Sequence, residues 1–312
     1  MITRPFGVAV AGTGIMGGRM LAALAPHERF RVVALWDPDA DALQRAVSGT
    51  PDARAARSLD DLVGDPSVDL VYIASPPATH RRCVAAALAA GRACLCEKPL
   101  AADVDDAEAL RELVVDARLP FAVNFPFASA PASRRLIELV RGGRLGEIRS
   151  ATITARFAQW PRPWQMGAST WLAGDAEGGF TREVLSHFVF LAQRLFGSVS
   201  VADVELVREP GRSETALRAR LVHAQGSVTI DAAVAGDVAD QNRFEIVGSM
   251  GTAALVDWSR LAFDGELSER VDATPGTLDR LAWMLSGRVD HDLATVGEGV
   301  AVVRCIEGML RG

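Results

Sequence analysis

The sequence predicts an α/β protein with a doubly wound parallel sheet at its N-terminal end. A C-terminal α/β domain with a large, mostly antiparallel open sheet is expected to follow. Strand and helix patterns alternate over the first 120 residues, and after about residue 124 they give way to runs of alternating apolar and polar residues. Because 312 residues exceed one ordinary core, we expect two domains, residues 1–123 and 124–312.

The first domain is predicted from near-continuous apolar runs, of which residues 68–74 are an example. Such runs suit parallel strands that are covered on both faces, and ligands of these sheets gather beyond the carboxyl ends of the strands. Strands are expected at 6–11, 31–36, 69–74, 92–96 and 120–124, and helices at 15–25, 39–47, 77–90 and 103–117.

A glycine-rich turn follows the first strand, where residues 8–17 read Val-Ala-Val-Ala-Gly-Thr-Gly-Ile-Met-Gly. Gly12 permits the tight turn, Gly14 lets the backbone approach a pyrophosphate, and Gly17 lets the helix pack close to the sheet. The helix that begins near Ile15 offers unpaired N–H groups to the phosphates. The pattern predicts a dinucleotide site formed by Gly12, Thr13, Gly14, Ile15, Met16 and Gly17.

Asp37 follows Gly17 by 20 positions, at the end of the second apolar run. A carboxylate there accepts hydrogen bonds from a ribose 2′-hydroxyl and repels a 2′-phosphate, so NAD is favoured over NADP. Asp37 followed by Pro38 would also start the next helix well, and the two roles are compatible.

Composition limits the partners and the compartment. The net charge of −6 provides no basic footprint for nucleic acid or an anionic membrane, and no run of about 20 apolar residues is long enough to span a bilayer. The first residues lead directly into a strand, which leaves no room for a signal peptide. No spacing suits a metal, and the four cysteines are expected to be reduced and buried in a cytoplasmic protein: Cys83, Cys94, Cys96 and Cys305.

The second domain is predicted from period-two alternation joined by short polar turns. Alternating runs lie at 147–158, 199–208, 215–223, 226–235, 242–248 and 252–257, and helices are expected at 132–142, 180–196 and 293–310.

Four segments resemble the Gfo/Idh/MocA oxidoreductases, the relatives of glucose–fructose oxidoreductase and inositol dehydrogenase. They are Ala-Ser-Pro-Pro-Ala-Thr-His at 74–80, Gly-Arg-Ala-Cys-Leu-Cys-Glu-Lys-Pro-Leu at 91–100, Gly-Gly-Arg-Leu-Gly-Glu-Ile at 142–148 and Phe-Glu-Ile-Val-Gly-Ser-Met-Gly-Thr at 244–252. The resemblance implies a Rossmann domain and hydride transfer between NAD(P) and a carbinol carbon of a sugar, cyclitol or related polyol. It also implies a homodimer or homotetramer formed through the C-terminal sheet.

The resemblance assigns roles at the strand ends of the first domain. Lys98 stands where the family places its catalytic lysine, and an ammonium there can hold a substrate hydroxyl and transfer a proton. A lysine after a buried strand can also merely extend to solvent. Cofactor contacts are expected from Ser75, Pro76, His80, Glu97 and Lys98.

A second group of candidates lies in the C-terminal domain. Residues 178–187 resemble the family's glycine-rich entry to a helix that carries an acid, here Glu183, four residues before the catalytic His187. Positions i and i+4 share a helix face, so the carboxylate and the imidazole can point together. His187 can also be an ordinary core histidine. Substrate contacts are expected from Asn124 and Trp164 in addition to Lys98, Glu183 and His187, although burial would explain the tryptophan about as well.

The chain departs from the family where relatives more often carry polar groups. Glu183 replaces an aspartate, Leu185 a small residue and Phe190 an acid, and residues 125–128 read Phe-Pro-Phe-Ala. A less polar pocket and a substrate with fewer hydroxyls than a hexose are therefore plausible. Two other functions stay open, a non-catalytic dinucleotide-binding regulator and an NAD-dependent glycoside hydrolase.

Overall fold

The computed structural model describes residues 4–234, 236 and 239–312. The chain forms two compact units, and each contains two separate stretches of the sequence. The first unit comprises Met1–Phe125 and Pro275–Val300, and the second comprises Pro126–Thr274 and Ala301–Gly312.

The first unit contains a six-stranded sheet in the order β3-β2-β1-β4-β5-β6, and every neighbouring pair is parallel. This confirms the doubly wound sheet expected from the sequence. A short edge strand, β3, is an addition to the expected set. The strands are β1 (Phe6–Ala11), β2 (Phe30–Trp36), β3 (Arg54–Ala55), β4 (Leu70–Ile73), β5 (Ala93–Glu97) and β6 (Phe121–Asn124).

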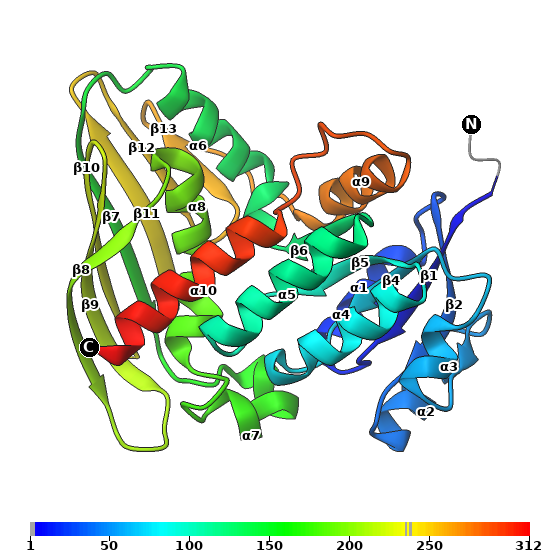
Figure 1. Cartoon of the computed structure of the whole chain (residues 1–312). Helices are drawn as coiled ribbons and strands as arrows, with labels where there is room; N and C mark the ends of the chain where they lie inside the picture. Colours follow the sequence, from blue (N-terminus) through cyan, green and yellow to red (C-terminus); the bar gives the residue numbers. More distant parts are fainter. Residues whose placement is uncertain (1–3, 235, 237–238) are drawn as a thin grey trace. The chain divides into compact units, whose positions relative to one another are not determined.

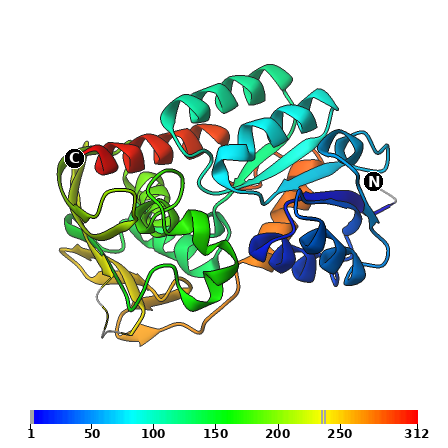
Figure 2. The ribbon, with the colours of Figure 1, turned by 90° about the horizontal axis from the view of Figure 1, so that it is seen from below.

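Helices cover both faces of this sheet, with α4 and α5 on one face and α1 and α9 on the other (Figures 1 and 2). Leu278 and Leu281 of α9 share a core with Val8, Tyr72 and Leu95 of the strands, so a C-terminal segment completes this unit. The helices are α1 (Ile15–Leu24), α2 (Ala40–Ser48), α3 (Leu59–Val63), α4 (His80–Ala89), α5 (Val104–Ala117) and α9 (Thr274–Leu285).

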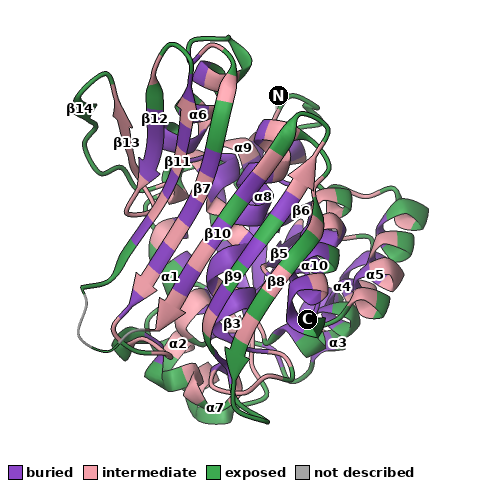
Figure 3. Ribbon diagram, turned by 90° about the vertical axis from the view of Figure 1, so that its left-hand side faces the viewer, coloured by how far each residue is buried: buried purple, intermediate pink, exposed green. Residues whose placement is uncertain are grey.

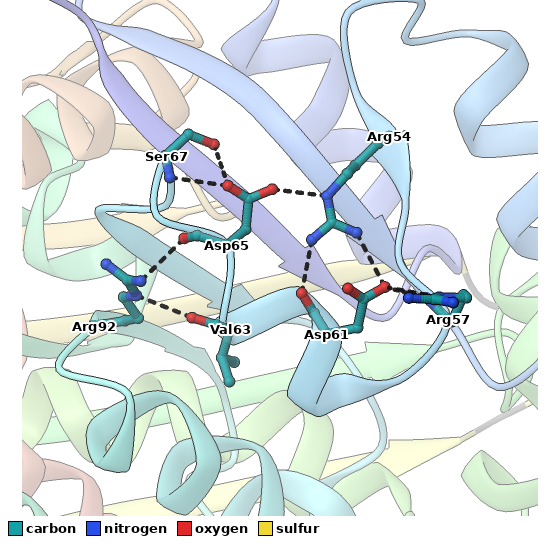
Figure 4. A network of polar contacts seen from close by, with 7 residues as sticks. All are labelled: Arg54, Arg57, Asp61, Val63, Asp65, Ser67 and Arg92. Carbon is teal, nitrogen blue, oxygen red and sulfur yellow. Dashed lines mark hydrogen bonds and ion pairs between the residues drawn. The ribbon is translucent and has the colours of Figure 1, made fainter.

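A polar network fixes the segment that leads from β3 to β4 (Figure 4). Arg54 contacts Asp65 at 2.7 Å and Asp61 at 3.1 Å, while the hydroxyl of Ser67 donates to Asp65 at 2.6 Å. Arg92 donates to the carbonyl of Asp65 at 3.0 Å. The hydrogen bond from Ser67 and then that from Arg54 lower the pKa of Asp65 to about 2.

The second unit contains an eight-stranded sheet in the order β14-β13-β12-β11-β7-β10-β9-β8. Only the β7–β10 pair is parallel, which confirms the mostly antiparallel sheet. The strands at residues 260–263 and 266–267, at one edge of the sheet, were not expected from the sequence. The strands are β7 (Ile148–Phe157), β8 (Ser200–Arg208), β9 (Glu214–His223), β10 (Gly226–Val234), β11 (Gln241–Gly248), β12 (Thr252–Val256), β13 (Arg260–Phe263) and β14 (Glu266–Leu267).

Alternation along these strands separates a buried face of the sheet from a more exposed one, which Figure 3 shows from outside. In β9 the buried face carries Leu217, Ala219 and Leu221. The remaining helices are α6 (Pro131–Arg141), α7 (Ser169–Leu172), α8 (Ser186–Phe196) and α10 (Val296–Arg311), with short 3₁₀ helices at Pro77–Thr79, Pro126–Ala128 and Pro163–Ala168.

Three expected helices begin differently from the sequence pattern. The helix expected from residue 77 opens with a 3₁₀ turn, and the one expected from residue 180 opens with a π-helical turn, η4 (Thr181–Leu185). The C-terminal helix begins at Val296 and not at 293, because Thr295 and Glu298 form a reciprocal capping box with bonds of 2.9 and 3.2 Å.

The four cysteines are free thiols, and all are buried. Burial raises the pKa of Cys305 to about 12, which keeps that thiol protonated and unreactive at neutral pH. Within the described ranges, none of the helices combines the length and the apolar character needed to cross a membrane.

Candidate active site

The glycine turn of the first unit has the geometry that a dinucleotide needs. Gly12 has φ +96°, and a Cβ there would lie 2.6 Å from the nitrogen of Ser75. A Cβ on Gly17 would lie 2.1 Å from the carbonyl oxygen of Gly12. Only glycine fits at these two positions, which ties the turn to the end of β4 and seats α1 against the sheet.

Gly14 differs from these glycines, because a Cβ there would meet no atom within 4 Å. Packing within the chain therefore does not account for this glycine, whereas a phosphate lying against the backbone would. Gly14 is the N-cap of α1 and makes no side-chain capping bond, so the first turn of the helix keeps N–H groups for an anion. The turn fits a pyrophosphate.

Asp37 lies against the same turn. One carboxylate oxygen accepts from the backbone N–H of Thr13 at 2.6 Å and from its hydroxyl at 3.1 Å. The other accepts from the N–H of Asp39 at 2.9 Å. A carboxylate has about four acceptor positions, so one remains for a ribose hydroxyl. The helix N-cap is Asp39 and not Asp37, which resolves the alternative left open by the sequence.

A buried polar network occupies the ends of β4, β5 and β6. The carboxylate of Glu97 accepts from the hydroxyl of Tyr72, from the amide of Asn124 at 2.6 Å and from the backbone N–H of Lys98 at 3.3 Å. Burial raises the pKa of Glu97, and the two side-chain hydrogen bonds and the charge of Lys98 oppose that rise. The network holds the residue that precedes Lys98 in one position.

His80 is fully buried at the start of α4. Its Nε2 lies 2.8 Å from the carbonyl oxygen of Ser75, and its Nδ1 lies 3.1 Å from that of Leu100. The ring therefore joins the loops that follow β4 and β5, which carry Ser75, Pro76 and Lys98. The structure places His80 within the scaffold of the expected cofactor site.

The chain has 33 lysine and arginine residues together, and Lys98 is the only lysine among them. All the others are arginines, so the residue that follows β5 carries the one lysine ammonium group of the sequence. The distinction has a chemical meaning, because an ammonium can release a proton and a guanidinium in a protein cannot.

In the second unit, a buried ion pair fixes the entry to the helix that carries Glu183 and His187. Arg182 and Glu307 of α10 are joined by two bonds of 2.6 and 2.9 Å. Arg182 also donates to the carbonyls of Asp175 and Gly178 at 2.7 and 2.9 Å. The guanidinium thereby closes the loop before η4 and ties it to α10.

Glu183 and His187 are the only residues that are not buried between Gly178 and Ala192, all of which the structure describes. Glu183 lies in the π-helical turn and His187 in the first turn of α8. A π turn often marks a functional site because it changes which side chains face outward. Both candidates are accessible, while their neighbours form core.

His187 contacts two aromatic rings. Its ring centroid lies 5.6 Å from that of Phe127 and 5.4 Å from that of Trp258, which meets it edge to face at 79°. The guanidinium of Arg162 lies 4.7 Å from the ring of Trp164 and 5.8 Å from that of Trp258. Trp164 is 42% exposed, so it belongs to the accessible rim of this cluster.

The apolar departures from the family are mostly core residues. Phe125, Leu185 and Phe190 are almost fully buried. Phe127 is equally buried, but it contacts His187 and therefore makes the surroundings of that residue less polar.

One residue in each unit contacts a candidate site residue and was not expected from the sequence, Tyr72 in the first unit and Trp258 in the second. Tyr72, the only tyrosine, sits in an ordinary apolar run, and its bond to Glu97 depends on the register of neighbouring strands. Trp258 follows an expected strand and is 71 positions from His187 in sequence. Neither has a local motif, although an aromatic residue in a hairpin turn is an unusual choice.

The turn, the strand-end network and the parallel sheet define an NAD-binding Rossmann domain. Residues 6–125 match the model of the oxidoreductase family with an NAD-binding Rossmann fold, and residues 133–254 match the C-terminal domain of the same family. The chain belongs to the Gfo/Idh/MocA oxidoreductase family.

Two relatives and one solved structure show the extent of the similarity. An uncharacterized oxidoreductase of Synechocystis is 28% identical over 64% of this chain and 55% of its own length. Inositol 2-dehydrogenase 3 of Saccharopolyspora erythraea is 29% identical over 94% of this chain and 86% of its own length. An oxidoreductase structure from Thermotoga maritima superposes with a TM-score of 0.87 at 18% identity, covering 99% of this chain and 96% of that one.

Proposed function

We propose that the protein is an NAD(P)-dependent dehydrogenase or reductase that acts on a carbinol carbon of a sugar, cyclitol or related polyol. The observation that carries the proposal is the single lysine of the chain, which follows a buried Glu97–Tyr72–Asn124 network at a strand end of an NAD-binding domain. The relative named inositol 2-dehydrogenase 3, which this chain matches over most of its length, supports the substrate class.

Lys98 and His187 would handle the proton of the substrate hydroxyl, and Glu183 would orient the substrate or the imidazole. The nicotinamide supplies a hydride acceptor or donor when it is bound. A neutral imidazole can accept a proton near pH 7, and the lysine can hold the hydroxyl oxygen. Asn124 and Trp164 are proposed as substrate contacts, although Asn124 already donates to Glu97.

NAD is proposed as the preferred cofactor. The carboxylate of Asp37 is held beside Thr13, where it can accept from a ribose hydroxyl and would repel a 2′-phosphate. The neighbouring residues Pro38 and Asp39 provide no positive charge that could neutralise such a phosphate.

We also propose a cytoplasmic location and self-association through the eight-stranded sheet. Four free thiols suit a reducing compartment. The more exposed face of the sheet offers a broad surface to a second copy (Figure 3). Light scattering on the purified protein tests the assembly, and a monomer at all concentrations would contradict it.

The experiment that tests the function monitors NADH formation with inositols, hexoses and their deoxy and acid derivatives. The proposal expects net turnover with at least one of them and faster turnover with NAD than with NADP. Cofactor binding without turnover on the whole panel would favour a regulator. Cleavage of a chromogenic glycoside without net change of the cofactor would favour a hydrolase.

The single lysine provides a second readout that is independent of turnover. Protein labelled with ¹³C-lysine has one side-chain lysine signal, that of Lys98. Polyols that bind in the presence of NAD should shift this signal, so binding and reaction can be ranked separately. If substrates turn over and the signal stays in place, the role of Lys98 is rejected.

A further inference from the structure

The connection between β12 and β13 has an unusual backbone. Val256 pairs with Arg260, and between them Asp257 has φ +47° and Trp258 has φ +69°. Residues in the left-handed region are normally glycine, asparagine or aspartate, so Asp257 is a usual choice there and Trp258 is not. A tryptophan in that conformation is a true outlier, and such strained residues cluster at functional sites.

Asn242 of β11 holds both residues of this turn. Its backbone carbonyl accepts from the N–H of Asp257 at 3.0 Å, and its side-chain oxygen accepts from the N–H of Trp258 at 2.9 Å. Asn242 is itself buried, with 4% exposure. The sheet therefore fixes the backbone of the turn, which cannot relax without breaking these bonds, and with it the Cα position from which the indole extends.

The indole held in this way lies against His187. The two ring centroids are 5.4 Å apart at an interplanar angle of 79°, an edge-to-face arrangement that aromatic pairs favour. Phe127 contacts both rings, at 5.6 Å from His187 and 6.1 Å from Trp258. The imidazole, the indole and the phenyl ring thus form one cluster in mutual contact, and all three belong to the second unit.

We propose that Trp258 is a positioning residue that fixes the orientation of the His187 imidazole. The inference rests on the proposed function of His187. The indole also packs on Phe188 at 5.4 Å and on Phe157 at 6.4 Å, so it is itself held in place beside His187, and it remains partly buried. Its contact with His187 gives this fixed ring a role, because a proton acceptor works only when its ring nitrogen is aimed at the substrate.

The orientation can be measured directly on the imidazole. The chain has five histidines, so protein labelled with ¹³C,¹⁵N-histidine gives a small set of ring signals, assigned by Gln substitution of each histidine. In Trp258→Ala, the signals of His187 should move more than those of the other four. Trp258→Phe should restore them in part, because a ring remains at the contact. Trp283→Phe in α9, which contacts Arg280 and Arg288, is the matched control and should leave His187 unchanged.

A second variant removes the support and keeps the indole. Asn242→Ala deletes the bond to the N–H of Trp258, so the ring loses its fixed position and the His187 signals should broaden or move. Cofactor affinity of each variant verifies that the first unit is intact. Because Trp258→Ala also removes the ring current of the indole, Asn242→Ala, which keeps the ring, decides: if it moves the signals of His187 no more than those of the other histidines, the proposal is overturned.

Kinetics separate this inference from the proposed function. With a substrate from the panel, Trp258→Ala should lower kcat by roughly 10- to 100-fold, the range that small misplacements of a catalytic group cause, and change KM for NAD little. Trp258→Phe should recover most of kcat. If no substrate turns over but the imidazole signals respond to Asn242→Ala, which keeps the indole, the positioning holds and the proposed reaction fails. If turnover is normal in Trp258→Ala, the positioning role fails alone.

Discussion

The two units hold their candidate residues by different physical means. In the first unit, the candidate residues stand at the carboxyl ends of parallel strands: Asp37 follows β2, and Glu97 at the end of β5 is held by register beside Asn124 of the adjacent β6, directly before Lys98. In the second unit, His187 is surrounded by side chains from distant parts of the chain, including Phe127 and Trp258. The first arrangement is dominated by hydrogen bonds and the second by ring contacts.

This difference predicts how each half responds to mutation. Strand-end groups are fixed by the sheet, so replacing one of them should remove its chemistry and leave its neighbours in place. Ring contacts are shared among several side chains, so replacing one ring should shift the others. Trp258→Ala, described above, replaces one of these rings. The four substitutions that follow replace charged groups of the two units, from the largest expected effect to the smallest.

Lys98→Ala should lower turnover by about 10³-fold, within the range for the loss of a positioned proton-transfer group. The Kd of NADH should stay within about threefold, because the glycine turn does not depend on this side chain. Steady-state kinetics and calorimetry measure the two quantities. Lys98→Arg keeps the charge and should also lose turnover, and unchanged turnover in either variant rejects the assignment.

Arg182→Ala should destabilise the second unit by about 3–5 kcal/mol, because it leaves the carboxylate of Glu307 buried without its cation. The double replacement Arg182→Met with Glu307→Leu should lower the free energy of unfolding far less, because no unpaired charge stays buried. Urea unfolding, followed by the tryptophans of the second unit, measures both. If the single and the double variant lose the same free energy of unfolding, the ion pair does not fix the loop before η4.

Asp37→Ala should weaken NAD binding by about 10- to 100-fold, the effect of losing a hydrogen bond to a charged group. NADP binding should change less or improve, because the repulsion of the 2′-phosphate is also lost. Asp39→Ala is the control, since Asp39 caps α2 through the N–H groups of Asp41 and Ala42. Equal weakening of both cofactors would reject the proposed discrimination.

Asp65 should make the stability of the first unit depend on pH. Its folded pKa of about 2 lies below the usual value of 3.8, so the stabilisation is fully present above about pH 4 and is lost as the pH falls toward 2. Asp65→Asn should remove about 1 kcal/mol at pH 7 after solvent screening and flatten the acid limb of the stability curve. Asp203→Asn, in the exposed pair with Arg220 of the second unit, should change little.

The same contrast explains what the sequence could predict. The parallel sheet, the glycine turn and the strand-end residues were predictable, because apolar runs and glycine constraints are local. The strand β3 was missed because it has only two residues, and α9 because its apolar positions pack on a sheet some 200 residues earlier in the chain.

The surroundings of His187 could not be predicted in this way. Glu183 and His187 were expected to share a helix face, and both are accessible, but the π turn between Thr181 and Leu185 has no sequence signature. The contact with Trp258 depends on a strained turn that Asn242 supports from another strand. Such features arise from tertiary packing, which overrides local preference.

Single-turnover kinetics on Lys98→Ala, His187→Gln and the double variant test most directly whether the amine and the imidazole serve one reaction. Groups that act as a unit give strongly non-additive losses. The account predicts that each single variant loses about 10²- to 10⁴-fold in the rate of NADH formation and that the double variant is little worse than the poorer single one. Losses that multiply in the double variant, or an unaltered rate in either single one, would contradict it.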